Sequence, residues 1–135
     1  MNVLVDTSVW SLALRRVSQS GHPYAEELAE LIREGRVVIV GPMRQELLSG
    51  VREAKQFATL REHLRAFPDL ALETEDFEQA AEFYNKYRTK GIQGSTIDFL
   101  ICAVAVRREL SIFTTDADFP RYARVLALQL HGPRD

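Results

Sequence analysis

The sequence predicts an α/β protein, organised as a three-layer α/β/α sandwich around a central, mostly parallel sheet. Three short runs, residues 2–6, 36–40 and 111–115, are apolar without alternation. Such runs are typical of parallel strands that are buried on both faces. The segments between them carry apolar residues at helical spacing. Because strands that alternate with helices form a parallel sheet covered on both faces, the order of the elements predicts this fold class.

Five strands are expected. The first ends at Asp6, and the second is broken by Gly41 and Pro42, which together open a helix. The third is the short apolar segment 70–72, and the fifth closes the chain. The predicted strands cover residues 2–6, 36–40, 70–72, 111–115 and 125–130.

Seven helices are expected around the sheet. Thr7 or Ser8 is expected to cap the first helix, which runs to about Arg16 and is followed by a polar loop over 17–22. Pro23 suits the first turn of the second helix. The predicted helices cover residues 7–16, 23–34, 42–51, 53–67, 74–89, 95–109 and 117–124.

Residues with strong positional preferences support the other helix ends. Gly35 is suited to end the second helix, and Thr74 to cap the fifth. Ser95 and Asp98 form an S-x-x-D capping box at the start of the strongly apolar sixth helix. These residues place Asp98 in the first turn of that helix.

The composition predicts one globular domain over residues 1–135. Hydrophobic residues make up 46% of the chain and charged residues 27%, which is ordinary for a soluble domain of this length. No apolar stretch reaches the roughly 18–20 residues of a membrane span. The first residues lack the basic leader and cleavage site of a secretory signal. We therefore expect a cytoplasmic protein.

Cysteine and histidine usage excludes several kinds of site. Cys102 is the single cysteine and lies in an apolar run, so neither a disulfide nor a cysteine-based zinc site is expected. The three histidines are widely separated, which argues against a zinc site or a His-dependent triad. The net charge of −2 argues against non-specific coating of nucleic acid. Arginine accounts for 14 of the 17 basic residues, which is compatible with solvated helix faces or with a phosphate-binding rim.

Four acidic residues are the candidate functional residues: Asp6, Glu46, Asp98 and Asp116. Asp6 and Asp116 each close an apolar strand, and ligands of open α/β sheets bind beyond the carboxyl ends of the strands. Four carboxylates in one cleft repel each other unless a hard divalent cation neutralises them. Each residue also has a structural alternative, as a helix cap, a solvated helix residue, a capping-box acid or a turn residue.

Four local motifs occur in one order along the chain. They are Val-Asp-Thr-Ser at 5–8, Glu-Leu at 46–47, Asp-Phe-Leu-Ile-Cys-Ala at 98–103 and Thr-x-Asp-x-Asp-Phe at 114–119. Together they resemble the PIN-domain ribonucleases and, more closely, the VapC toxins of bacterial and archaeal toxin–antitoxin pairs. The resemblance covers essentially the whole chain, and it implies a single PIN-like domain.

The resemblance implies an active site made of Asp6, Glu46, Asp98 and Asp116. By the same resemblance, the hydroxyls of Thr7 or Ser8 and of Thr114 help to hold the site, and Asp118 is an auxiliary acid. We expect Asp6, Asp98 and Asp116 to bind Mg²⁺ or Mn²⁺, since these ions favour carboxylate oxygen. Glu46 is expected to orient or deprotonate the attacking water, or to complete a second metal site.

The resemblance implies an endoribonuclease that leaves a 3′-hydroxyl and a 5′-phosphate and acts as the toxin of a type II pair. It also implies a homodimer that a small VapB-like antitoxin neutralises by lying across the active-site groove. Val9, Trp10 and Leu12 either contribute to that groove or belong to the core, and Trp10 could instead stack on a base. Neither the RNA target nor the number of metal ions follows from the sequence.

Three other functions are considered. A PIN-domain nuclease that processes RNA without being a toxin would carry the same acids. A non-catalytic PIN-like module should have lost one or more of them. A phosphoaspartyl protein, either a receiver domain or a phosphatase, needs a late lysine and, for the phosphatase, an Asp-x-Asp after the first strand. The chain has Asp6-Thr7-Ser8 there and lysines only at 55, 86 and 90.

Overall fold

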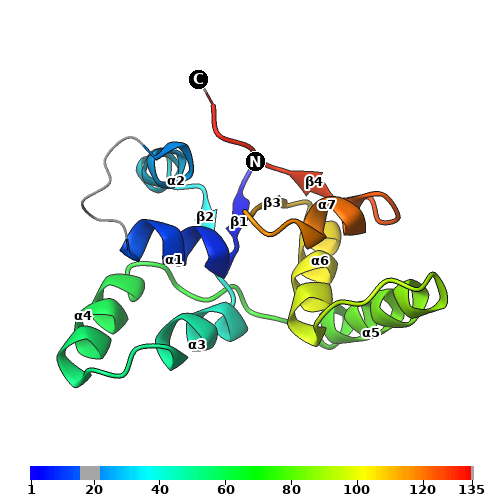
Figure 1. Ribbon diagram of the computed structural model, residues 1–135, viewed down its shortest axis with the longest axis horizontal. Helices are drawn as coiled ribbons and strands as arrows, with labels where there is room; N and C mark the ends of the chain where they lie inside the picture. Colours follow the sequence, from blue (N-terminus) through cyan, green and yellow to red (C-terminus); the bar gives the residue numbers. More distant parts are fainter. Residues whose placement is uncertain (16–21, 135) are drawn as a thin grey trace.

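Four parallel strands form the central sheet of the described residues, 1–15 and 22–134, in a computed structural model of the protein (Figure 1). The strand order is β2-β1-β3-β4, and every neighbouring pair is parallel. β1 and β3 therefore lie side by side at the centre, with Val5 opposite Phe113 at their carboxyl ends. The strands are β1 (Val3–Val5), β2 (Val37–Val38), β3 (Ser111–Phe113) and β4 (Gln129–Leu130).

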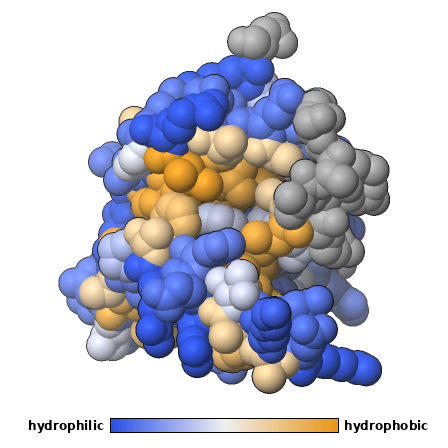
Figure 2. Space-filling model, turned by 90° about the vertical axis from the view of Figure 1, so that its left-hand side faces the viewer, coloured by the Kyte–Doolittle hydropathy of each residue, from blue (hydrophilic) through white to orange (hydrophobic). Residues whose placement is uncertain are grey.

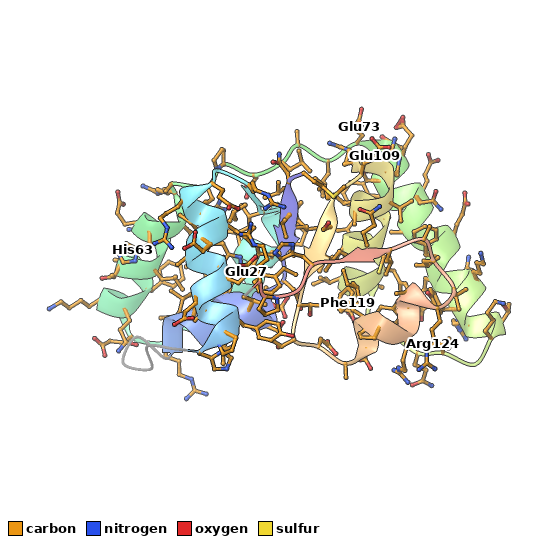
Figure 3. The ribbon with its side chains drawn as sticks, turned by 90° about the horizontal axis from the view of Figure 1, so that it is seen from above. Glu27, His63, Glu73, Glu109, Phe119 and Arg124 are labelled. Atoms are coloured by element: carbon orange, nitrogen blue, oxygen red, sulfur yellow. The ribbon has the colours of Figure 1, made fainter. Side chains whose placement is uncertain are left out.

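Helices lie on both sides of this sheet (Figures 1 and 3). The first four lie on one side, and the last three on the other. This arrangement confirms the predicted three-layer α/β class with a parallel sheet. The helices are α1 (Thr7–Arg15), α2 (Pro23–Arg33), α3 (Gly41–Ser49), α4 (Ala54–Leu64), α5 (Thr74–Thr89), α6 (Thr96–Arg108) and α7 (Asp118–Ala123).

Two predicted strands are wrong in whole or in part. The segment 70–72 is not a strand: its neighbourhood forms only an isolated bridge between Ile39 and Asp69. Because α3 begins at Gly41, the partner chain turns away before a longer ladder can form. The last predicted strand, 125–130, is reduced to β4, since the residues before it turn back onto α7 through the hydrogen bond from Leu126 N to Tyr122 O.

Two predicted helix caps are also wrong. α1 begins at Thr7 itself, and the Asp6 carbonyl accepts from the N–H of Val9, so neither Thr7 nor Ser8 is the cap. α5 likewise begins at Thr74. Its cap is Glu73, whose backbone N–H donates to the Asp76 carboxylate at 2.7 Å.

Three predicted helix ends are confirmed. Ser95 caps α6, its Oγ accepting from the backbone N–H of Asp98 at 3.0 Å. Pro23 opens α2, and Gly35 follows its last turn with a positive φ of 68°, a conformation that glycine adopts without strain. The predicted end of α1 at Arg16 and most of the loop after it lie outside the described residues.

The core is built from the strands and the inner faces of the helices. Val9 and Trp10 belong to it, with Trp10 4% exposed and packed edge-on against Phe67. They are therefore core residues, and Trp10 is not free to stack on a base. Cys102 is fully buried in α6, as its apolar context predicts. No helix of the described chain combines the length and apolarity that crossing a membrane requires.

Candidate metal-dependent active site

The centre of the candidate site is the carboxyl edge of β1 and β3. Asp6 follows β1 directly, and its backbone N–H continues the ladder to Phe113 O at 2.9 Å. Its Oδ2 accepts two hydrogen bonds, from Ser8 Oγ at 2.9 Å and from Thr114 Oγ1 at 2.8 Å. Thr114 follows β3 directly, so pairing of the two strands brings this acid and this hydroxyl together. Asp6 is 6% exposed and held from both strand ends.

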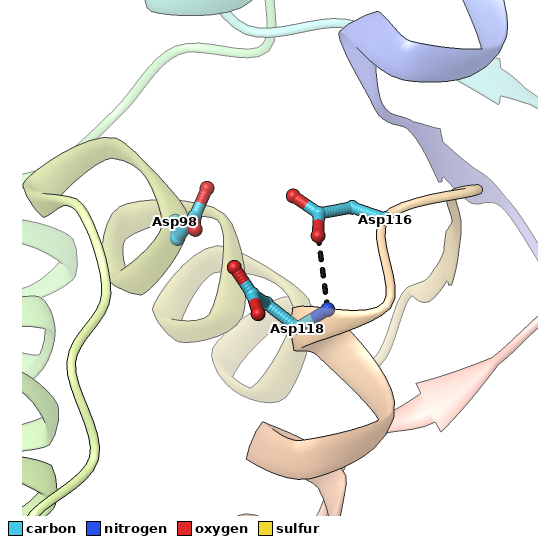
Figure 4. A group of neighbouring side chains, drawn as sticks. All are labelled: Asp98, Asp116 and Asp118. Carbon is cyan, nitrogen blue, oxygen red and sulfur yellow. Dashed lines mark hydrogen bonds between the residues drawn. The ribbon is translucent and has the colours of Figure 1, made fainter.

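Thr114 also orders the loop that carries the next acids. Its Oγ1 accepts from the backbone N–H of Asp116 at 3.0 Å. Asp116 Oδ1 in turn accepts from the backbone N–H of Asp118 at 2.9 Å, at the start of α7 (Figure 4). Asp118 Oδ1 accepts from the Arg121 guanidinium at 2.6 Å. This chain of bonds fixes two carboxylates within five residues of the end of β3.

Asp98 lies in the first turn of α6, which brings it to the same carboxyl edge of the sheet. Its Oδ2 accepts from the hydroxyl of Tyr122 on α7 at 3.0 Å. Burial of the carboxyl raises the pKa of Asp98, and the charges of Asp116 and Asp6 raise it further, whereas hydrogen bonds with Tyr122 and Ser95 lower it. The result is a raised pKa for Asp98, caused first by burial and then by the neighbouring carboxylates. Burial and the charge of Asp98 also raise the pKa of Tyr122, so the phenol stays protonated and donates.

Asp98, Asp116 and Asp118 form a three-acid cluster. One carboxylate oxygen from each lies within 4.8 Å of the others, and all three residues are half-buried (Figure 4). Oxygens bound to one Mg²⁺ lie about 2.1 Å from the ion, and so at most about 4.2 Å apart. Small side-chain rotations would bring the cluster to that spacing. Its all-oxygen donor set fits a hard divalent cation.

The four sequence-predicted acids lie at one edge of the sheet but are not equivalent there. Asp98 and Asp116 share the cluster, and Asp118, expected to be auxiliary, completes it. Asp6 lies beside the cluster, outside that group of oxygens, with one oxygen engaged by two hydroxyls. Its charge nevertheless raises the pKa of Asp98.

Glu46 lies on α3 as an exposed residue. Partial burial of its carboxyl raises its pKa, and the charges of Asp6 and Asp98 add to that rise, against a hydrogen bond with Thr7 that lowers it. The carboxyl thus faces the same acids while it remains open to solvent. Proton acceptors with raised pKa values are suited to general base chemistry near neutral pH.

One residue of the site has no counterpart among the predicted site residues, namely Tyr122. It lies four residues after Asp118, one helical turn along α7, and it is fully buried. In the sequence such a tyrosine is indistinguishable from core packing. Only its four-residue spacing from Asp118 could have indicated that the two side chains lie on the same face of a helix.

Comparison with known proteins places these features in a family. The family model described as the PIN domain matches residues 3–125. Ribonuclease VapC11 of Mycobacterium tuberculosis (strain ATCC 25618 / H37Rv) is 34% identical over 131 residues, covering 94% of this chain and 96% of that protein. The VapC ribonuclease Mb1587 of Mycobacterium bovis matches to the same extent.

Solved structures share the architecture at lower sequence identity. FitAcB from Neisseria gonorrhoeae superposes with a TM-score of 0.76 at 24% identity, covering 96% of both chains. At this identity the similarity bears on the fold alone. It extends over almost the full length of the described chain, including the helices that carry the acids.

Proposed function

Because the chain belongs to the PIN-domain family, we propose that it is a metal-dependent endoribonuclease and the toxin of a type II toxin–antitoxin pair. Relatives that are 34% identical over nearly the whole chain are named VapC ribonucleases, which supports RNA as the substrate. The observation that carries the proposal is the three-acid cluster at the carboxyl edge of a parallel sheet. We further propose that residues 1–135 act as a single domain in the cytoplasm.

The cluster residues Asp98, Asp116 and Asp118 would hold Mg²⁺ or Mn²⁺, with Asp6 beside them. When bound, such an ion lowers the pKa of a coordinated water and offsets negative charge on the phosphate. Asp6 contributes negative charge at a fixed position, because Ser8 and Thr114 hold its Oδ2.

Glu46 is proposed to accept the proton of the attacking water. Its raised pKa suits a proton acceptor that must release the proton again after each turnover. Its exposed position on α3 keeps the carboxylate accessible to water and to an RNA strand. Thr7, which bonds to this carboxyl, would orient it.

A cleavage assay with Asp98→Asn and Asp118→Asn tests the metal-dependent nuclease. In Mn²⁺ we expect the wild type to cut RNA, and each variant to lose at least about a hundredfold in kcat/KM, because a ligand is lost. Glu82→Gln, an exposed acid on α5, is the matched control and should cut like the wild type. Cleavage that persists in excess chelator, or in Asp98→Asn, would disprove the metal site.

We also propose a small VapB-like antitoxin as a partner and a homodimer as the toxin's own state. Structures with this fold include VapBC2 from Rickettsia felis, solved bound to a DNA fragment from its promoter, with a TM-score of 0.76 at 20% identity and 97% of this chain covered. The side of the molecule that carries α1, α2 and α4 has an apolar, hollowed area (Figure 2). Leu14, Glu46 and Leu60 are among the residues that line a groove of about 410 Å³. A segment of the antitoxin bound in this groove would approach the active site through Glu46.

Growth of a bacterial host separates a toxin from a processing nuclease. Expression of the chain alone should arrest growth, expression of Asp98→Asn should not, and co-expression of the proposed VapB-like antitoxin should restore growth. Metal-dependent RNA cleavage without growth arrest would instead identify a PIN-domain nuclease that processes RNA.

A further inference from the structure

Tyr122 links the two helices that carry the acid cluster. Its hydroxyl donates to Asp98 Oδ2 on α6 at 3.0 Å. Its backbone belongs to α7, the helix that begins at Asp118. One side chain therefore joins the acid of α6 to the helix that carries another acid of the same cluster.

The position of this hydroxyl is fixed from several sides. Its ring packs against those of Phe99 at 5.2 Å, Phe119 at 5.3 Å and Tyr87 at 5.4 Å. The hydroxyl of Tyr87 also donates to the backbone carbonyl of Tyr122, so both the ring and its main chain are anchored. Tyr122 is fully buried, whereas Asp98 is half-buried, so the phenol holds the carboxylate from its protein side.

Gly94 makes room for the same hydroxyl. A Cβ atom at this position would overlap the Tyr122 hydroxyl oxygen and would lie 2.9 Å from the Phe99 ring. Side chains do not approach so closely, so any larger residue would displace the phenol or the segment before α6. The absence of a side chain at Gly94 thus leaves space for the Tyr122 hydroxyl and for the edge of the Phe99 ring.

We propose that Tyr122 is a positioning residue for the nuclease site, holding Asp98 at the orientation that the cation requires, with Gly94 providing the space. The inference rests on the proposed function, since it assigns the orientation of a proposed metal ligand. The tyrosine occupies one carboxylate oxygen of Asp98 and leaves the lone pairs of the other for the ion. Hydrogen-bond partners of metal ligands act in this way, and their loss typically lowers metal affinity or activity by about 10–100-fold.

Mn²⁺ binding to Tyr122→Phe tests the inference without relying on activity. Free Mn²⁺ is followed by electron paramagnetic resonance during titration of the full chain, alongside thermal unfolding. We expect the Kd for Mn²⁺ to rise about tenfold and kcat at saturating RNA to fall, with the KM for RNA little changed. Tyr84→Phe is the matched control, because its ring packs against the same Phe99 at 5.7 Å and its hydroxyl bonds to none of the described acids. It should bind Mn²⁺ like the wild type.

Gly94→Ala probes the same bond from the opposite side. Its Cβ should displace the phenol and weaken Mn²⁺ binding to an extent similar to Tyr122→Phe. In the Tyr122→Phe background the hydroxyl is absent and only the contact with the Phe99 ring remains, so Gly94→Ala should cause a clearly smaller loss of affinity than it does in the wild type. Independent, multiplicative losses would show that Gly94 acts on something other than this hydroxyl, and would overturn its assigned role.

Asp98→Asn separates failure of this inference from failure of the proposed function. If it removes Mn²⁺ binding while Tyr122→Phe keeps the wild-type Kd and kcat, the metal site stands and the positioning role is wrong. If the wild type binds no Mn²⁺, or Asp98→Asn binds it equally well, both the metal site and the inference are wrong. A Tyr122→Phe protein that unfolds at lower temperature but retains its Kd would show a structural role only.

Discussion

At the residue scale, one hydroxyl connects the acids that come from two strand ends. Thr114 Oγ1 donates to Asp6 Oδ2 and accepts from the backbone N–H of Asp116. It therefore fixes the distance between an acid that follows β1 and the loop that follows β3. A hydroxyl can do both at once because it has one donor and two acceptor lone pairs.

Replacement of this hydroxyl should lower activity more than stability. For Thr114→Val we expect kcat/KM to fall about tenfold, because Asp6 and Asp116 lose their common partner. The free energy of unfolding should fall by only about 1 kcal/mol, the typical net worth of a hydrogen bond. Steady-state cleavage and chemical denaturation measure the two quantities.

Thr115→Val is the matched control for that substitution. Thr115 is exposed and uses its backbone N–H, not its hydroxyl, to donate to Ser8 Oγ. It should therefore cut RNA like the wild type. Equal losses at the two positions would show that Thr114 contributes only general packing of the loop.

The acids of the site could be predicted from the sequence to different degrees. Asp6 was identifiable because it ends a buried run that only a strand explains, and Asp98 because Ser95 marks the helix start. The share of Asp118 in the cluster could not be predicted, since it depends on how the Thr114 loop folds back. The role of Tyr122 could not be predicted, because a tyrosine among apolar residues is expected to be a core residue. Only the structure shows that its hydroxyl bonds to Asp98.

At the element scale, an ion-pair group joins the start of α5 to the end of α6. Asp76 is fully buried and contacts the guanidinium groups of Arg107 and Arg108. Burial of this carboxyl raises its pKa, but the Glu73 backbone N–H and both arginines more than offset burial and lower it. The group fixes α6, the helix that carries Asp98, relative to α5.

The lowered pKa of Asp76 predicts how stability depends on pH. The folded state keeps the carboxylate ionised below the unfolded-state pKa of about 3.9. Its contribution is therefore complete above about pH 4 and is lost as the pH falls through the folded-state value. Asp76→Asn should cost about 3 kcal/mol at pH 7, and the difference in Tm from the wild type should narrow below about pH 4.

Glu75→Gln serves as the control for the pH experiment. It changes an exposed acid in the same turn of α5 and should leave the stability curve near that of the wild type. A Tm difference for Asp76→Asn that stays constant from pH 2.5 to 7 would contradict the role of the ionised carboxylate.

The elements themselves followed from the sequence where local signals and packing agree. The helices and the strands β1, β2 and β3 were predicted because their apolar patterns match their buried faces. The segment 70–72 failed as a strand because its partner ends at α3, a tertiary circumstance that no local pattern contains. The prediction that Thr74 caps α5 was wrong because the helix is capped one residue earlier, at Glu73. The Asp76 carboxylate accepts from the backbone N–H of Glu73 and so stabilises that start.

At the scale of the whole molecule, charge is distributed unevenly around the acid cluster. The chain carries a net charge of −2, yet exposed basic residues lie at the end of α5 and along α7. Packing of Tyr87 against Tyr122 brings these two segments together. We name this surface the basic rim; its residues are Arg88, Lys90, Arg121 and Arg124.

The basic rim should bind the phosphates of the proposed RNA substrate beside the cluster. Arg124 follows α7 and lies six residues from Asp118, about 9 Å along a helix axis (Figure 3). Arg124→Glu should raise the KM for RNA at low salt without changing kcat at saturation. Because fewer counterions are then released on binding, the slope of log KM against log salt concentration should become shallower by roughly one unit. Arg65→Glu makes the same change in net charge at the far end of the molecule, beside His63 of α4, and should leave that slope unchanged (Figure 3). An equal change in slope for both variants would mean that RNA responds to the total charge of the protein rather than to the basic rim.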